Sequence, residues 1–147
     1  MSQRILIVEP EPHAREGLRA ILAGVGHEVV VAADIPGGFE HLTARPFDVL
    51  LLDADLSRRE VVLSVLDLLR LARMRDERAS GVLLTSSVED LPNDLASEGV
   101  VAVLERPVEL ARLRQALETA GARSARAGKA RPSRSRSGER EERRTTG

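Results

Sequence analysis

Apolar residues are distributed along this chain in two different patterns, and the first is a set of short continuous runs. These runs are Arg4–Val8, Glu28–Ala32, Asp48–Leu52, Gly81–Leu84 and Val100–Leu104. They are rich in valine, isoleucine and leucine, and their length suits strands that are buried on both faces of a parallel sheet. The pattern therefore predicts five strands.

The second pattern is apolar residues that recur at helical spacing between the strand-like runs. The helical segments lie at Leu18–Val25, within Asp34–Thr43, at Val62–Ala72 and at Leu110–Ala120. Gly37 and Gly38 weaken the second of these helices, because glycine lowers helix stability. The sequence thus predicts helices that alternate with the strands.

Local signals mark where three of the helices begin. The capping box Ser57-x-x-Glu60 starts the third helix, and Pro107 stands at the first helical position of the last one. Ser87-x-x-Asp90 predicts the start of a further helix after the fourth strand, although Pro92 disturbs its first turns. Five strands that alternate with five helices predict an α/β fold, a doubly wound five-stranded parallel sheet.

The chain is predicted to divide into residues 1–120, a folded domain, and residues 121–147, a disordered basic tail. The first part holds 13 arginines and 20 acidic residues, whereas the tail holds 9 basic and 3 acidic residues and is rich in Arg, Ser, Gly and Ala. Such a tail buries too little apolar surface to offset its ordering entropy. It lacks aromatic residues, so we expect a solvated linker that folds back on the acidic body, and not a nucleic-acid-binding segment.

Composition removes several classes of function. There is no cysteine among the 147 residues, which excludes disulfides and thiolate metal sites. The sequence shows neither a stretch long enough to span a membrane nor a signal-peptide pattern, so we expect a cytoplasmic protein without membrane contact. His13, His27 and His41 share no metal-ligand spacing, and we expect ordinary surface roles for them.

Reactive side chains follow four of the predicted strands. Glu9 follows the first strand, Asp53 the third, Thr85 the fourth and Arg106 the fifth. The carboxyl ends of parallel strands meet at one edge of the sheet, where ligands bind in open α/β folds. Two carboxylates, a hydroxyl and a cation are what the phosphorylation of a carboxylate requires, because the hydroxyl and the cation receive the phosphoryl oxygens.

At residues 3–120 the sequence resembles the receiver domain of two-component response regulators. The resemblance is carried by four segments, Ile5–Glu11, Phe47–Leu56, Val82–Ser87 and Val103–Pro107. It implies the five-stranded flavodoxin-like receiver fold. It also implies that Asp53 is the phosphoacceptor, that Thr85 is the switch hydroxyl, and that Mg²⁺ is held by Glu9, Asp53 and the backbone carbonyl of Asp55.

Three positions depart from the family pattern. Pro10 stands where the family places the second member of an acidic pair, so a metal ligand is missing and Mg²⁺ binding is expected to be weak or lost. Arg106 replaces the family's lysine before Pro107, and we expect the Arg106–Pro107 peptide to be cis, as the family's Lys–Pro bond generally is. Val103 replaces the aromatic residue that changes rotamer on activation.

These observations leave two main functions open. The first is a stand-alone receiver that accepts a phosphoryl group on Asp53 from a histidine kinase or phosphotransfer protein and modulates an unknown output partner. The alternative is a pseudo-receiver, a protein-interaction module that works without phosphorylation, in which Arg106 simply pairs with Glu9 or Asp53 and the Asp55 charge disfavours an anionic phosphodonor.

The remaining expectations concern enzymatic activity and oligomeric state. An enzyme on a flavodoxin-like scaffold is the weakest reading, because the loop after the first strand lacks the glycines of a phosphate cradle; we therefore expect a protein that is not an enzyme. Receivers often form homodimers through the fourth and fifth helices and strand five, and Pro92 makes that face atypical here.

Overall fold

The computed structural model describes residues 2–55 and 59–129, and its centre is a parallel sheet of five strands. The strands are β1 (Arg4–Val8), β2 (Glu28–Ala32), β3 (Val49–Asp53), β4 (Ser80–Thr85) and β5 (Val100–Glu105). Their order in the sheet is β2-β1-β3-β4-β5. All five predicted strands are confirmed, the first two with the expected bounds and the others within one residue.

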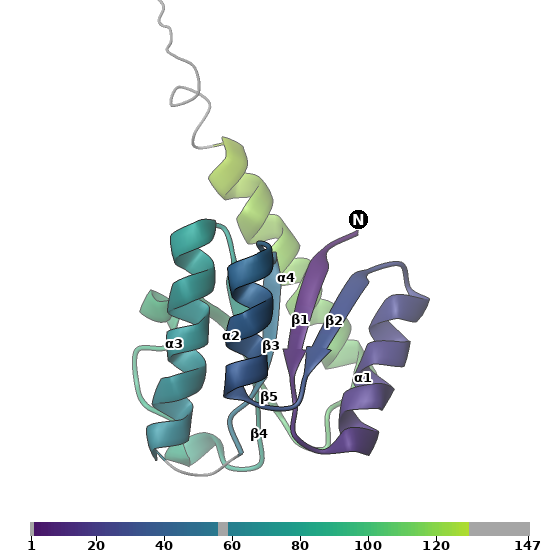
Figure 1. Cartoon of the computed structure of the whole chain (residues 1–147), viewed down its shortest axis with the longest axis vertical. Coiled ribbons are helices and arrows are strands. Elements are labelled where there is room, and N and C mark those ends of the chain that lie inside the picture. The colour runs from purple at the N-terminus through teal and green to yellow at the C-terminus, as the bar shows by residue number, and fades with distance from the viewer. Residues whose placement is uncertain (1, 56–58, 130–147) are drawn as a thin grey trace, which may run out of the picture.

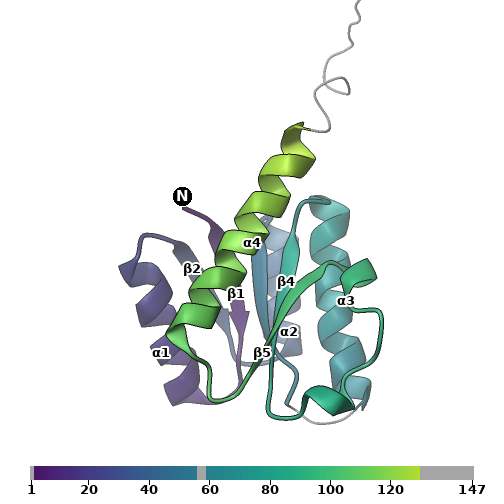
Figure 2. The same cartoon turned by 180° about the vertical axis from the view of Figure 1, so that it is seen from behind.

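Helices cover both faces of the sheet. The helices are α1 (Pro12–Gly24), α2 (Ile35–Ala44), α3 (Arg59–Arg75) and α4 (Leu110–Lys129). Figure 1 shows α2 and α3 in front of the sheet, and Figure 2 shows α1 and α4 on the opposite face. The doubly wound α/β class predicted from the alternation of strands and helices is therefore confirmed.

Successive residues of the central strands point to opposite faces, so each strand contributes to two cores. Leu50 and Leu52 pack with Leu42 of α2 and Leu69 of α3. On the other face Val49 and Leu51 pack with residues of α1 and α4, namely Leu22, Leu113 and Leu117. The β3 residues are fully buried on both faces, as the continuous apolar run predicted.

The prediction of a helix after the fourth strand is wrong. Residues 88–99 form two short 3₁₀ turns instead, η1 (Val88–Asp90) and η2 (Ala96–Glu98). Ser87 precedes the first turn but makes no side-chain capping bond. Pro92 removes a backbone donor, and Asp94 has a positive φ of 67°, which no α-helix permits. Between β4 and β5 the described chain therefore has no α-helix.

The bounds of α4 also differ from prediction. The helix begins at Leu110 and not at Pro107, which lies before it in a cis peptide bond with Arg106, as predicted. It continues to Lys129, so the expectation that helical structure ends by about Ala120 is wrong for residues 121–129. Figure 2 shows α4 projecting beyond the sheet. The rest of the predicted tail and the Ser57 capping box lie outside the described residues.

Candidate functional site

The carboxyl edge of the sheet brings together the four residues that the sequence placed after its strands. Asp53 ends β3 and pairs in register with Leu84, next to Thr85 at the end of β4. Glu9 follows β1, and Arg106 follows β5. Glu9, Asp53 and Thr85 are only 2%, 4% and 2% exposed. Two buried carboxylates side by side are costly unless a cation neutralises them.

Arg106 supplies that cation to both carboxylates and to a third. Its Nη2 donates to Glu9 Oε1 at 2.8 Å and to Asp53 Oδ1 at 3.1 Å. Its Nε donates to Asp55 Oδ2 at 2.7 Å. The guanidinium therefore lies at the centre of the site as a planar donor that contacts all three acids. The salt bridge to Glu9 or Asp53, an alternative raised by the sequence, is present to both residues.

The sequence placed the charge of Asp55 beside Asp53 and its backbone carbonyl at the metal, but it did not predict the partners of its side chain. The Asp55 carboxylate accepts hydrogen bonds from the Ser86 amide at 2.5 Å and the Ser86 hydroxyl at 2.8 Å. Its own N–H donates to Asp53 Oδ1 at 2.7 Å. This turn directs the Asp55 side chain toward the end of β4. The one signal in the sequence for a role of this side chain was the position of Asp55, two residues after Asp53.

Thr85 lies between Asp55 and the loop that follows β4. Its Oγ1 accepts a hydrogen bond from the Ser87 N–H at 3.0 Å. The nearby Thr85 side chain also helps to lower the pKa of the Asp55 carboxyl. The hydroxyl predicted as the switch group thus holds the Ser87 N–H in the loop after β4.

The two aspartates of this turn have pKa values that shift in opposite directions. Burial raises the pKa of Asp53, and the nearby Glu9 charge adds to the effect, while hydrogen bonds from the Asp55 N–H and Arg106 oppose it. Burial also acts to raise the pKa of Asp55, but hydrogen bonds from Ser86 and Arg106, together with the nearby Thr85 side chain, outweigh it, and the net pKa is lowered. Asp55 is therefore the carboxylate that the site stabilises as an anion.

The oxygen atoms at this edge fit Mg²⁺ poorly. Glu9 Oε1 and Asp53 Oδ1 each accept from Arg106, and Glu9 Oε2 accepts the Glu11 N–H at 3.0 Å. Pro10 has no side-chain oxygen. Among the side chains that the structure describes, those of residues 2–55 and 65–125, no group of three or more His, Cys, Asp or Glu is arranged to hold a metal ion. Mg²⁺ requires near-octahedral oxygen ligands, which this set does not supply.

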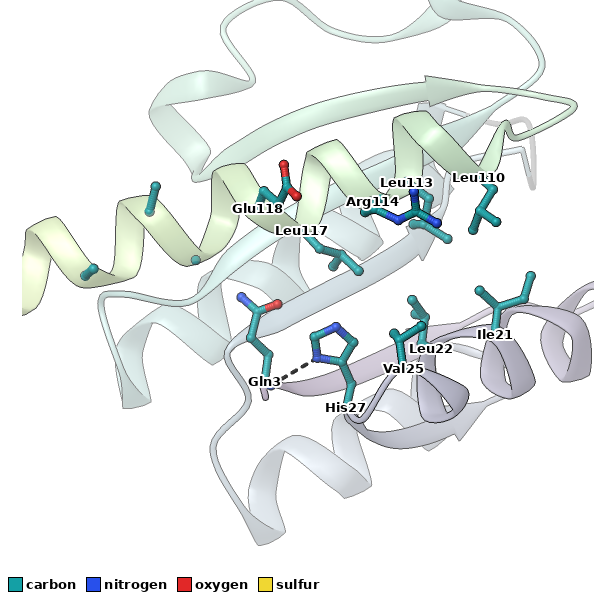
Figure 3. A pocket seen from close by; sticks show the side chains of 13 residues that line it. Gln3, Ile21, Leu22, Val25, His27, Leu110, Leu113, Arg114, Leu117 and Glu118 are labelled. Atoms are coloured by element: carbon teal, nitrogen blue, oxygen red, sulfur yellow. Dashed lines mark hydrogen bonds between the residues drawn. The ribbon is translucent and has the colours of Figure 1, made fainter. Parts of the chain in front are cut away.

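A separate apolar groove, about 570 Å³ in volume, lies between α1 and α4 (Figure 3). Its walls include Ile21 and Val25 on one side and Leu110 and Leu117 on the other. At its end, His27 Nδ1 accepts a hydrogen bond from the Gln3 N–H at 3.1 Å. None of the residues of the acidic site lines this groove. We expected an ordinary surface role for His27, but its ring also accepts a hydrogen bond from the backbone of Gln3 and so helps to hold the start of the chain.

Within the described ranges, no helix is both long and apolar enough to cross a lipid bilayer.

Solved structures with the same fold are numerous. The first to note is a response regulator receiver domain protein of Clostridium thermocellum, 25% identical, with a TM-score of 0.69, covering 84% of this chain and 98% of that one. The response regulator TrrA of Thermotoga maritima, solved in complex with Mg(2+)-BeF, is 23% identical with a TM-score of 0.64, covering 80% and 98%. A CheY-like receiver domain protein of Methanospirillum hungatei is 23% identical with a TM-score of 0.68, covering 86% and 99%.

Comparison of the sequence with curated proteins gives no significant match. The sequence model of the response regulator receiver domain, however, matches residues 5–118, which is most of the chain and contains every residue of the acidic site. By this match and by its fold, the chain belongs to the response regulator receiver domain family.

Proposed function

We propose that this chain is a receiver domain that acts as a protein-interaction module of two-component signalling, without phosphorylation of Asp53 and without enzymatic activity. The observation that carries the proposal is the position of Arg106, whose guanidinium contacts Glu9, Asp53 and Asp55. In this role the cation stabilises the buried acids of the fold, as a metal ion does in a phosphorylatable site.

Two features of the site support this reading. Phosphoryl transfer to a carboxylate depends on charge neutralisation by a metal ion, and the donor set at this edge fits Mg²⁺ poorly. The Asp55 carboxylate also places a negative charge beside Asp53, and Asp53 Oδ1 is already bonded to Arg106 and to the Asp55 N–H. An anionic phosphodonor approaching Asp53 meets like charge and an occupied acceptor atom.

The second candidate is a phosphoaccepting receiver that takes a phosphoryl group from a histidine kinase or phosphotransfer protein and modulates an output partner. The adjacency of Asp53 and Thr85 at the ends of paired strands favours it. In this version Arg106 must release Asp53 before the transfer, and Arg106 then binds the phosphoryl oxygens with Thr85. Glu9, Asp53 and the Asp55 carbonyl would hold Mg²⁺ weakly in this version, and the ion would supply charge neutralisation.

Intact mass after incubation with acetyl phosphate and Mg²⁺ separates the two candidates. The proposal expects no phosphoryl adduct on the wild-type protein. A matched variant, Pro10→Asp with Arg106→Lys and Asp55→Asn, restores the acidic pair, the family's lysine and a neutral residue beside the acceptor, and it is expected to gain the adduct. Adding Asp53→Asn to that variant should remove it. A wild-type adduct that Asp53→Asn abolishes would favour the second candidate.

A further inference from the structure

The Asp55 carboxylate is surrounded by hydrogen-bond donors from two other parts of the chain. The Ser86 N–H and hydroxyl donate to its two oxygens at 2.5 and 2.8 Å, and Arg106 Nε donates at 2.7 Å. These donors come from the end of β4 and from the residue after β5, so a single carboxylate joins three connections of the sheet.

The same donors are those that a phosphoryl group on Asp53 requires. The cation at position 106 and a backbone N–H at a strand end, here that of Ser86, are the kinds of donor that would bind phosphoryl oxygens at this edge. Arg106 contacts Asp53 through Nη2 and Asp55 through Nε, so Asp55 lies beside the acceptor. The two carboxylate oxygens of Asp55 accept from donors that would otherwise be open to two oxygens of a phosphoryl group.

We propose that the Asp55 carboxylate occupies, from within the chain, the position in which Ser86 and Arg106 would bind the oxygens of a phosphoryl group on Asp53, and that it holds these two residues there without phosphorylation. The proposal rests on the proposed function, in which Asp53 stays unmodified. It gives the side chain of Asp55 a role in determining which anion the site accepts. The oxyanion site formed by the donors of Ser86 and Arg106 is closed to external phosphate by the chain's own carboxylate.

A simpler role for Asp55, as one more counter-ion of Arg106, accounts for only part of the geometry. Glu9 and Asp53 already supply Arg106 with two carboxylates. The contacts to the Ser86 amide and hydroxyl do not neutralise charge, and they are the contacts that position the loop after β4. The two roles therefore differ in whether the Ser86 amide is hydrogen-bonded to Asp55, and that hydrogen bond is what the experiment measures.

The experiment compares wild-type protein with Asp55→Ala and Asp55→Asn by NMR, with no phosphodonor present. The first readout is the hydrogen-exchange rate of the Ser86 amide. The second is the change of the Ser86 amide shift on titration with inorganic phosphate. Asp90→Ala is the control, because Asp90 is an exposed acid of the same connection. Acetyl phosphate and intact mass, applied to a separate aliquot, test the proposed function independently.

In Asp55→Ala we expect Ser86 exchange to rise roughly tenfold or more, and phosphate to shift the Ser86 amide saturably, since the donors are then open. The wild-type protein and Asp90→Ala should show slow exchange and no phosphate response. The proposal is overturned if Ser86 exchange in Asp55→Ala stays within about twofold of wild type. If Asp55→Ala does not fold, Asp55→Asn decides: a phosphate response supports the proposal, and its absence with unchanged exchange rejects it.

Discussion

Arg106 Nη2 lies 2.8 Å from Glu9 Oε1, and this contact joins residues that are 97 positions apart in the chain. Glu9 follows the first strand and Arg106 follows the last, so the ion pair closes the carboxyl edge of the sheet across β3 and β4. The Glu9 side chain is 3% exposed and the Arg106 side chain 25%. An ion pair this deeply placed matters chiefly because breaking it leaves buried charge without a partner.

Replacing Arg106 by methionine is therefore expected to destabilise the protein by about 3 kcal/mol, because two buried carboxylates lose their cation. Urea unfolding measures the change. Arg112→Met is the control: its ion pair with Glu109 is exposed on α4, and its loss should change the free energy of unfolding by no more than about 0.5 kcal/mol. Equal effects of the two substitutions would contradict the view that Arg106 stabilises the fold by neutralising buried carboxylates.

A double-mutant cycle tests the pairing directly. Glu9→Gln removes one of the buried charges, so Arg106→Met should cost less in that background than in the wild-type protein. Additive effects of Glu9→Gln and Arg106→Met would mean that the two side chains act separately.

Magnesium binding is expected to depend on positions 10 and 106 together. We predict that the wild-type protein shows no saturable response to Mg²⁺ at millimolar concentration, because Arg106 holds Glu9 and Asp53 and position 10 offers no oxygen. The double variant Pro10→Asp, Arg106→Lys has an added carboxylate and no longer has the planar guanidinium that holds Glu9 and Asp53. We expect this variant to bind Mg²⁺. Calorimetric titration and the amide shifts of Glu9 and Glu11 report binding. Micromolar binding by the wild-type protein would reject this account of the site.

Much of the fold follows from local sequence. The runs Arg4–Val8 and Glu28–Ala32 became strands with their predicted bounds, because each is β-branched, continuous and bounded by polar or turn residues. The meeting of Glu9, Asp53, Thr85 and Arg106 followed from topology alone, since parallel strands place their carboxyl ends at one edge.

The parts that were not predicted depend on direction and on distant contacts. The capping signal at Ser87 suggested a helix, but Pro92 and the positive φ of Asp94 outweighed it. The Asp55 side chain could not be placed from spacing, because its direction is set by the turn from Asp53 and by donors on Ser86. Composition indicated disorder after Ala120, whereas the alanines of that segment favour a helix.

Arg123 anchors the unexpected extension of α4 to the start of β4. Its Nη1 donates to the Ala79 carbonyl at 3.1 Å, the Arg78 carbonyl at 3.3 Å and the Ser80 hydroxyl at 3.0 Å. Arg123→Ala should therefore lower the free energy of unfolding by about 2 kcal/mol, because the charged donor is lost and its acceptors lose their hydrogen bonds. Arg112→Ala, at an exposed position of the same helix, should have little effect. A chain ended at residue 120 should lose at least as much stability as Arg123→Ala, measured by urea unfolding.

His27 is expected to make stability depend on pH. Its Nδ1 accepts the Gln3 N–H, so protonation replaces an acceptor with a second donor facing the first (Figure 3). Burial lowers the pKa of His27 below its ordinary value of 6.5. Between that lowered pKa and 6.5 the unfolded chain binds more protons than the folded protein. This contribution to stability is therefore complete above pH 6.5 and is lost as pH falls toward the pKa of the folded state.

His27→Asn isolates this contribution, because the asparagine Oδ1 can accept from the Gln3 N–H and does not titrate. We expect its free energy of unfolding, measured in urea between pH 7.5 and about pH 5, to fall less steeply with decreasing pH than that of the wild-type protein. If His27→Asn and wild type share one slope, His27 contributes nothing to the pH dependence, and its contact with Gln3 is made equally well by the protonated ring.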